Sequence, residues 1–262
     1  MTLEGPTGFI VRTEAQKAAF ERGFRLERGA DGPWLRYAST TVPGEIWIAG
    51  AGPAGPWLLA VGHPGVAAEF GPAAILPGPG SGRFAFATLG QLYDALDRAW
   101  RLARSLPTVP LAEFQQQVAG LPRATEAERW TVRRVGQDIF RRALLDYWGE
   151  RCPLTGIADA ALLRASHIVP WAVCRDDAHR LDVHNGLLLS ALWDAAFDAG
   201  LVSFTGEGAV LFAPHLSSVA LTVLNDRKAS GIPDLAAPHD ANLREHRARH
   251  GFVAENGPAI PR

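Results

Sequence analysis

The sequence predicts an α+β protein: a small N-terminal α+β domain, a helical linker, and a C-terminal domain that combines short strands with helices. Three observations predict this class. Short strand-like runs separated by Gly and Pro clusters fill much of the first hundred residues, helical periodicity flanks them, and a proline-interrupted segment follows near residue 107. We therefore expect an N-terminal domain at 1–106, a linker at 107–124 and a second domain at 125–262.

The N-terminal domain begins with apolar residues at helical spacing, which predict a helix between Thr13 and Gly23. The runs "WLRYAST", "EIWIAG", "WLLAVG" and "RFAFATL" are expected to be strands, because Gly and Pro clusters bound them as turns. The segment "LGQLYDALDRAWRLARSL" then predicts a helix. Its apolar positions recur at Leu92, Leu96, Ala99 and Leu102.

The linker starts with "PTVPLAEF", where two prolines interrupt the periodicity, and a short helix is expected from Leu111 to Val118. A long helix should follow, because Thr125 and Glu128 have the spacing of a capping box and Gly149 ends the pattern. Beyond it, "LLRASHIV" predicts a strand and "LLLSALWDAAFDAGL" a strand leading into a helix. The runs "LVSF" and "AVLF" flank "TGEG", which predicts a hairpin.

The overall charge gives no sign of a polyanionic partner. The chain has 26 Lys+Arg and 27 Asp+Glu, so its net charge of −1 argues against a protein that holds nucleic acid by bulk electrostatics. Two segments, "RWTVRRVGQDIFRRALL" and "NLREHRARH", nevertheless gather Arg and His. Each is either a local phosphate-binding face or an ordinary solvated helix face.

Cysteine use and the N-terminal sequence favour a cytoplasmic protein. Cys152 and Cys174 form no CxxC pair, which excludes a thiolate zinc knuckle and disfavours a disulfide framework. The N-terminus has no basic start followed by an apolar core, and no run reaches the length of a membrane span. We therefore expect no membrane association.

Polar residues in "LLRASHIVPW" and after it carry the chemistry. His167 lies in an apolar, strand-like run, Asn185 closes the following polar loop, and Asp194 and Asp198 are four residues apart in a helical segment. Residues at i and i+4 share one helix face, where two carboxylates repel each other unless a cation lies between them. Both could instead face solvent, but their neighbours are almost all apolar, which favours metal ligation.

This order resembles the HNH, or ββα-metal, nucleases, and in particular a bacterial branch found beside restriction and defence systems. The resemblance covers roughly Arg151 to Phe204, in the blocks "CPLTGI", "LLRASHIVPW", "HNGLLLS" and "WDAAFDAGLVSF". It implies that 125–262 is an HNH nuclease domain, with a β-hairpin and a helix gripping one divalent ion. It also implies a metal-dependent endonuclease that hydrolyses phosphodiester bonds in DNA.

The resemblance assigns two catalytic positions and three metal positions. His167 corresponds to the general base that activates water, and Asn185 to the loop residue whose amide holds the hairpin in register. Asp194 occupies the position of the family's final His, and Asp198 that of a second helix ligand. Ser166 replaces the Asp or His ligand of many relatives, and a hydroxyl is a weak ligand. Carboxylates favour Mg²⁺, or Mn²⁺, over zinc.

Two further sets of residues are weaker candidates. His184, next to Asn185, is a secondary candidate for the active site, ahead of His179 and His215. Near the C-terminus, the basic positions Arg244, Arg247 and Arg249 are expected to contact the DNA backbone, unless this helix is simply solvated.

Target choice is expected to lie in residues 1–106, whose many aromatic side chains could stack a base or line a pocket for a modified one. Core packing explains these residues equally well. The substrate is then double-stranded DNA with a base or backbone modification, and the protein a modification-dependent restriction enzyme. Cutting both strands requires two active sites, which makes a homodimer a further expectation.

Two other functions stay open. A catalytically weak or inactive DNA-binding protein on an HNH scaffold is suggested by Ser166 in a ligand position, although His167, Asn185, Asp194 and Asp198 are all present. A nuclease toxin is the third class, but such proteins usually carry delivery segments, and no such segment is evident in the sequence.

Overall fold

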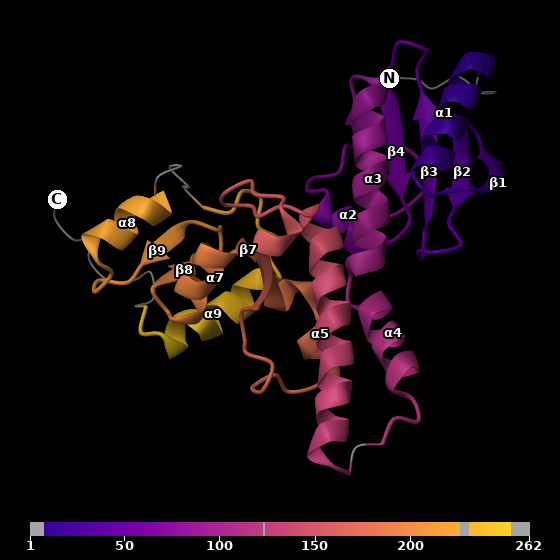
Figure 1. Ribbon diagram of the computed structural model, residues 1–262. Helices are drawn as coiled ribbons and strands as arrows, with labels where there is room; N and C mark the ends of the chain where they lie inside the picture. The colour runs from indigo at the N-terminus through magenta and orange to yellow at the C-terminus, as the bar shows by residue number, and fades with distance from the viewer. Residues whose placement is uncertain (1–7, 123, 226–230, 253–262) are drawn as a thin grey trace. The chain divides into compact units, whose positions relative to one another are not determined.

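The computed structural model describes residues 8–122, 124–225 and 231–252. The chain divides into two compact units, Met1–Val109 and Pro110–Arg262, and each is described here on its own. Both mix helices with antiparallel strands, which confirms the α+β class (Figure 1). The division falls inside the segment interpreted as a linker. No helix in the described ranges combines the length and the apolar character needed to cross a membrane.

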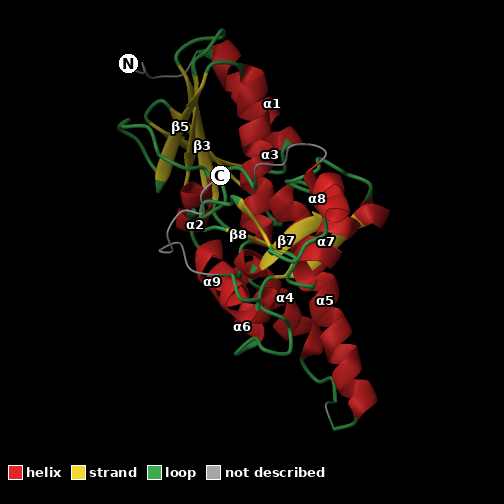
Figure 2. Cartoon of the chain, turned by 90° about the vertical axis from the view of Figure 1, so that its left-hand side faces the viewer, coloured by secondary structure: helices red, strands yellow, loops and turns green. Residues whose placement is uncertain are grey.

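Unit 1 is built around a five-stranded antiparallel sheet in which each strand pairs with its sequence neighbour. Its elements are α1 (Phe9–Glu21), β1 (Leu26–Asp31), β2 (Trp34–Ala38), β3 (Glu45–Gly50), β4 (Trp57–Val61), α2 (Pro64–Glu69), β5 (Gly82–Phe86) and α3 (Leu89–Ser105). Helices α1 and α3 lie beside the sheet (Figure 2). Strand β4 is buried at all five positions, as expected for a strand covered on both faces.

A small apolar cluster explains the second covered face of this sheet. Trp34, Ala49, Leu58 and Ala60 pack together, and Leu76 from the β4–β5 connection lies against them. The connection comes very close to the sheet at Gly78, where a Cβ atom would lie 2.8 Å from the Trp34 ring. The Trp34 ring is thus covered by the backbone of this connection.

Sequence reasoning missed two elements of unit 1. Strand β1 is mostly exposed and rich in charge, so it lacks the alternating pattern that identifies a half-buried strand. Helix α2 has only six residues, too few for a periodic signal, and begins where His63 accepts a hydrogen bond from the Val66 backbone. The four predicted strands and both predicted helices are present.

Unit 2 contains two long helices followed by short elements. Its elements are α4 (Thr108–Val118), α5 (Glu126–Trp148), η1 (Ala160–Leu162), β6 (Leu163–His167), α6 (Asp177–Leu181), η2 (Val183–Asn185), β7 (Gly186–Ser190), α7 (Ala191–Asp198), β8 (Val202–Phe204), β9 (Val210–Phe212), α8 (Ser218–Asn225) and α9 (His239–Arg249). The predicted hairpin is confirmed as β8 and β9, which pair antiparallel.

Helix α5 begins and ends as the sequence indicates. Thr125 and Glu128 form the expected capping box, and Gly149 adopts the left-handed conformation at the C-terminal end. Helix α4 lies beside α5 (Figure 1), with Arg142 paired to Glu113 and the buried Phe114 against Gly136. Most of the segment expected to be a linker is therefore packed into unit 2.

A β-hairpin and helix form the centre of unit 2. Strands β6 and β7 pair antiparallel from Leu163–Ser190 to His167–Gly186, and α7 starts directly after β7. The hairpin also packs against α5 at Gly186, where a Cβ atom would lie 2.5 Å from Phe140. Only glycine allows this approach, so Gly186 positions the end of the hairpin on α5.

Candidate functional site

The two helix carboxylates face the hairpin through Ser166. Asp194 and Asp198 lie one turn apart on α7, and the Ser166 hydroxyl is 3.5 Å from Oδ1 of Asp198, at the limit of a hydrogen bond. Burial raises the pKa of both carboxyl groups. The negative charge of Asp194 raises the pKa of Asp198 further. Hydrogen bonding to Ser166 opposes the shift in both groups. The sequence expectation of paired carboxylates on one helix face is therefore met.

The donor set at this cluster suits a hard divalent cation held partly by water. Two carboxylates that repel each other, with a hydroxyl between them, supply oxygen donors only. Across the ranges that the structure describes, no three His, Cys, Asp or Glu side chains are arranged to hold a metal ion. An ion at this cluster would thus have few protein ligands and would keep several waters, as Mg²⁺ commonly does.

His167 is held by a ring stack and one hydrogen bond. Its imidazole stacks on Phe140 of α5, with centroids 3.8 Å apart, and meets Trp171 edge to face. Nε2 is 2.9 Å from the carbonyl oxygen of Arg180. Because a carbonyl oxygen only accepts hydrogen bonds, Nε2 carries the proton and Nδ1 keeps the lone pair. Burial lowers the pKa of His167 to about 4, so the ring is neutral at pH 7.

His167 and the carboxylate pair occupy opposite faces of the hairpin. Successive strand residues point to opposite sides, so Ser166 faces α7 while His167 faces α5. The contacts of the imidazole are with Phe140, Trp171 and Arg180, and none of these residues touches the carboxylates in the contacts described. The structure joins the two groups through neighbouring residues at the end of β6, not through direct contact.

Asn185 is enclosed in backbone hydrogen bonds. The side chain is 0 % exposed, its Oδ1 accepts from the Val169 N–H at 2.8 Å, and its amide donates to the carbonyl oxygens of Val169 and His179. It also donates to the Cys174 sulfur. This geometry makes Asn185 a positioning residue that fixes the chain after β6, because a side chain so enclosed cannot reach a substrate.

His184 contributes to packing behind the hairpin. Its Nδ1 is 2.9 Å from Oδ1 of Asp182, and its ring lies edge to face against Tyr147 and His239. The bond to His184 contributes to the lowered pKa of Asp182. These contacts belong to an aromatic cluster on α5, η2 and α9.

The basic residues of α9 form ion pairs within their own helix. Arg244 and Arg247 both pair with Asp240, and Arg249 pairs with Glu245 at 2.7 Å. The Arg247 side chain is only 13 % exposed and donates to the Phe204 carbonyl oxygen. The expectation that Arg244, Arg247 and Arg249 contact the DNA backbone stays a prediction, because two carboxylates pair with these three arginines and leave one positive charge of the set uncompensated. The i, i+4 spacing from Asp240 to Arg244 and from Glu245 to Arg249 is the sequence signal that indicates two of these ion pairs.

Sequence reasoning did not single out the two rings that hold His167. Phe140 follows the helical period of α5 and Trp171 follows a proline, so both look like ordinary core or loop residues. Nothing in their spacing indicates that they meet an imidazole. Only the packing of α5 on the hairpin brings Phe140 to His167.

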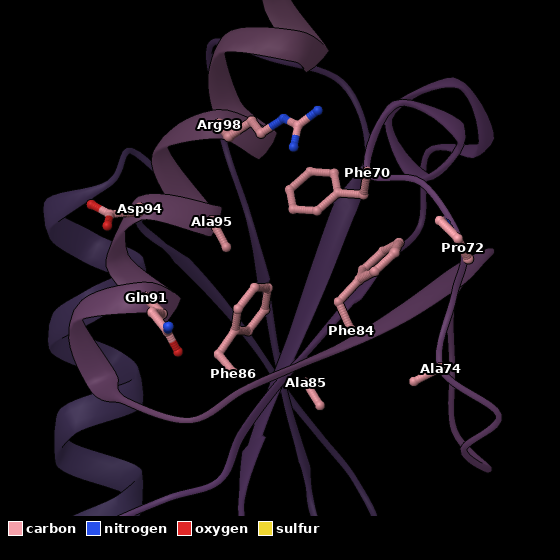
Figure 3. A pocket seen from close by; sticks show the side chains of 10 residues that line it. All are labelled: Phe70, Pro72, Ala74, Phe84, Ala85, Phe86, Gln91, Asp94, Ala95 and Arg98. Atoms are coloured by element: carbon pink, nitrogen blue, oxygen red, sulfur yellow. The ribbon is translucent and has the colours of Figure 1, made fainter. Parts of the chain in front are cut away.

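Unit 1 contains a separate aromatic pocket of about 640 Å³ between α3 and β5. Figure 3 shows the rings of Phe70, Phe84 and Phe86 gathered there, with Asp94 and Arg98 on the helix side. Phe70 and Phe84 lie 4.9 Å apart, and the Arg98 guanidinium lies 5.0 Å from the Phe70 centroid. In contrast, Trp34, Tyr37 and Trp57 are buried in the core.

Comparison with known proteins agrees with the hairpin and helix. Residues 152–205 match the family model described as HNH endonuclease. The match lies wholly in unit 2 and runs from Cys152 through β6, β7 and α7 to the end of β8. A search of curated proteins gave no match to the chain.

Proposed function

We propose that the HNH endonuclease domain at residues 152–205 makes this protein a metal-dependent endonuclease that cuts DNA. One observation carries the proposal. Within the region matched by the family model, the end of β6 carries the neutral histidine His167 next to Ser166, whose hydroxyl lies at the carboxylate pair of α7. Because these side chains point to opposite faces of the hairpin, the proposal requires the phosphodiester to lie across the end of β6, where the two Cα atoms are about 3.8 Å apart.

His167 is the proposed general base. Its Nδ1 lone pair takes a proton from water while the water oxygen bonds to phosphorus and the bond to the leaving 3′ oxygen breaks. The hydrogen bond from Nε2 to the Arg180 carbonyl oxygen fixes the ring in the tautomer that this step requires. The Phe140 stack fixes the plane of the ring. Asn185 holds the chain on which the imidazole depends.

Ser166, Asp194 and Asp198 are the proposed holders of a divalent ion, Mg²⁺ or Mn²⁺. Such an ion supplies electrophilic stabilisation of the charge that develops on phosphate oxygens. Asp194 and Asp198 provide two negative charges, whose mutual repulsion is relieved when a cation binds. HNH nucleases in general use a divalent metal, and the oxygen-only donor set supports a hard ion.

Cleavage of plasmid DNA tests the proposal. Wild type, His167→Ala and Asp198→Asn are compared with Mg²⁺, with Mn²⁺ and with chelator. Cutting that requires both the metal and His167 is the expected result, with a loss on the order of 10²-fold or more in His167→Ala. Retained DNA binding without cutting in wild type would favour the alternative, an inactive DNA-binding protein, which the serine in a ligand position supports.

We further propose that residues 1–106 recognise a modification in double-stranded DNA, so that the protein acts as a modification-dependent restriction enzyme. The aromatic pocket of unit 1 supports this role. Its volume lies in the range of small-molecule sites, and the rings of Phe84 and Phe86 offer stacking faces for a flipped base. Asp94 and the amide nitrogen of Gln91 are the proposed hydrogen-bond partners of the base edge. The Gln91 carbonyl oxygen is not among them, because it already accepts a hydrogen bond from the Ala87 N–H.

Matched plasmids test this second proposal. Unmodified DNA is compared with DNA carrying methylated, hydroxymethylated or phosphorothioate sites. Preference for one modification, abolished by Phe86→Ala and by Asp94→Asn, is expected. Equal cutting of all four plasmids by wild type would remove the recognition role and leave the nuclease proposal intact.

A homodimer would bring together the two active sites that double-strand cleavage needs. Exposed apolar side chains support such an interface: Leu162, Leu192 and Val223 line a groove of about 380 Å³ beside α7. Sedimentation of wild type and Leu192→Glu is the test. We expect wild type to be a dimer and the charged substitution to dissociate it. We also propose that the protein acts in the cytoplasm.

A further inference from the structure

The first half of α5 exposes a tryptophan among arginines. Trp130 is 54 % exposed, and the Arg133 guanidinium lies over its ring, 5.4 Å from the centroid. Arg129 and Glu126 join them around a shallow hollow of about 280 Å³. Because single exposed apolar side chains are common on protein surfaces, the arginines beside the Trp130 ring carry more of the argument than its exposure does.

In the part of the chain that the structure describes, the arginines of this segment have no carboxylate partner, unlike Arg142 and the arginines of α9. Within the described residues, no carboxylate pairs with Arg129, Arg133 or Arg134. Farther along α5, Arg142 pairs with Glu113, and Arg141 donates to the carbonyl oxygens of Leu163 and Ala160. The α9 arginines are paired as well. Three arginines without a carboxylate partner among the described residues therefore lie within the six residues 129–134 in the first half of α5.

This segment is continuous with the proposed active site. Arg129, Arg133, Gly136 and Phe140 are spaced by three or four residues and share one helix face. Phe140 stacks on His167, and Gly136 lies against the Trp171 ring. Arg133 lies seven residues before Phe140, about 10 Å along the helix axis.

We infer that Arg129, Trp130 and Arg133 form the surface on which the DNA sugar–phosphate backbone lies beside the cleavage position. The inference rests on the proposed nuclease function and names its DNA-binding face. A planar guanidinium group can donate two hydrogen bonds to phosphate oxygens, and the guanidinium of Arg133 lies over the Trp130 ring, a contact that favours one placement of its charge. No base-reading group is involved, so this surface contributes affinity and position, not sequence preference.

The test is binding of a labelled 30-base-pair duplex, taken from a plasmid used in the cleavage assay, in chelator and over a range of NaCl concentrations. Arg129→Gln with Arg133→Gln is compared with wild type and with Arg244→Gln plus Arg249→Gln. The two double variants lose the same charge from a helix. Only the α5 variant should bind more weakly, by about tenfold at 0.1 M salt. Its slope of log K against log salt should be shallower by about two.

Two further variants separate charge from packing. Arg129→Lys with Arg133→Lys should restore the salt slope, because the slope counts charges. Trp130→Leu should keep the slope and weaken binding less than the loss of both arginines does. Urea unfolding of each variant shows whether the fold is retained, which is expected because all three side chains are exposed.

The outcomes distinguish this inference from the proposed function. If wild type cuts DNA and the α5 and α9 variants bind with the same affinity and slope, the α5 surface is refuted and the nuclease stands. The same holds if the α5 variant binds normally but cuts slowly. If wild type neither binds nor cuts duplex DNA, both the surface and the proposed function fail.

Discussion

The imidazole of His167 stacks on the phenyl ring of Phe140, with centroids 3.8 Å apart and planes inclined by 19°. This contact ties the end of β6 to the middle of α5. It removes one face of the imidazole from water, and burial is the main reason that the pKa falls to about 4. The same stack therefore orients the proposed base and keeps it neutral.

Phe140→Leu should lower the cleavage rate without removing the base. The smaller side chain leaves the imidazole free to tilt, and a loss of about tenfold to a hundredfold follows from misplacement of a catalytic group. Water admitted to the site should also move the acid limb of the pH–rate profile upward, toward the ordinary pKa of histidine. Phe24→Leu, a similar core change in unit 1, is the control. An unchanged profile would mean that the stack does not tune His167.

Asp198→Asn should stabilise the metal-free protein while abolishing cutting. The raised pKa of Asp198 means that its ionised form is disfavoured in the fold, so removing the charge relieves repulsion from Asp194. The gain is below about 1 kcal/mol, because the side chain is solvent-screened. Millimolar Mg²⁺ or Mn²⁺ should raise the melting temperature of wild type but not of the variant.

The control for this prediction is Asp138→Asn, which removes an exposed carboxylate from α5. It should melt like wild type, with and without metal. A metal-dependent rise in the melting temperature of Asp198→Asn equal to that of wild type would place the ion elsewhere.

Asn185→Ala should destabilise the protein by about 2–4 kcal/mol. The substitution leaves the Val169 N–H and the carbonyl oxygens of Val169 and His179 buried without their partner. Asn242→Ala, at a partly exposed residue that donates to the His184 carbonyl oxygen, should cost less. Chemical denaturation measures both. Equal losses would argue that burial of Asn185 is not what makes it important.

Stability should fall as the pH is lowered from about 6.5 toward 4. Burial lowers the pKa of both His167 and His246 to about 4, whereas the unfolded chain takes up these protons near 6.5. The unfolded state therefore binds more protons in this window, and each histidine contributes about 3 kcal/mol across it. The raised pKa values of Asp194 and Asp198 act in the opposite direction at the acid end.

Denaturation at several pH values above 5 measures this dependence with least interference from the carboxylates. The His246 imidazole stacks on Phe197, with ring centroids 3.9 Å apart. The substitution His246→Phe keeps a ring in this place and removes one titrating group. The variant should be less stable at pH 7.5, because Ser203 loses its partner, but its stability should vary less with pH. A slope as steep as that of wild type would contradict the assignment.

Two helical glycines should respond oppositely to alanine. At Gly136 a Cβ atom would lie 2.4 Å from the Trp171 ring, so Gly136→Ala should force the loop after β6 outward and cost about 1–3 kcal/mol. At Gly90 the nearest atom would be 3.9 Å away, so Gly90→Ala should be neutral or stabilising by up to about 1 kcal/mol. Thermal melting of both variants, with plasmid cleavage for Gly136→Ala, checks this. A tolerated Gly136→Ala would show that the Trp171 loop adapts freely.

Local features of this protein can be predicted from the sequence, because they depend on residues a few positions apart. The capping box of Thr125 and Glu128, the β8–β9 hairpin and the one-turn spacing of Asp194 and Asp198 are all of this kind. The ion pair of Arg244 with Asp240 is equally local, because its i, i+4 spacing is present in the sequence. Strand β1 could not be predicted from the sequence, because an exposed edge strand has no alternating pattern of apolar and polar residues.

The sequence by itself determined the α+β class, the chemical groups of the proposed site and their order along the chain. Only the tertiary structure decided where those groups point. Strand alternation sends Ser166 toward α7 and His167 toward α5, and the packing of α5 at Gly186 then decides that a phenyl ring meets the imidazole. The burial that lowers the pKa of His167, and the ion pair between Arg142 of α5 and Glu113 of α4, arise between elements distant in sequence. Spacing along a single chain cannot specify them.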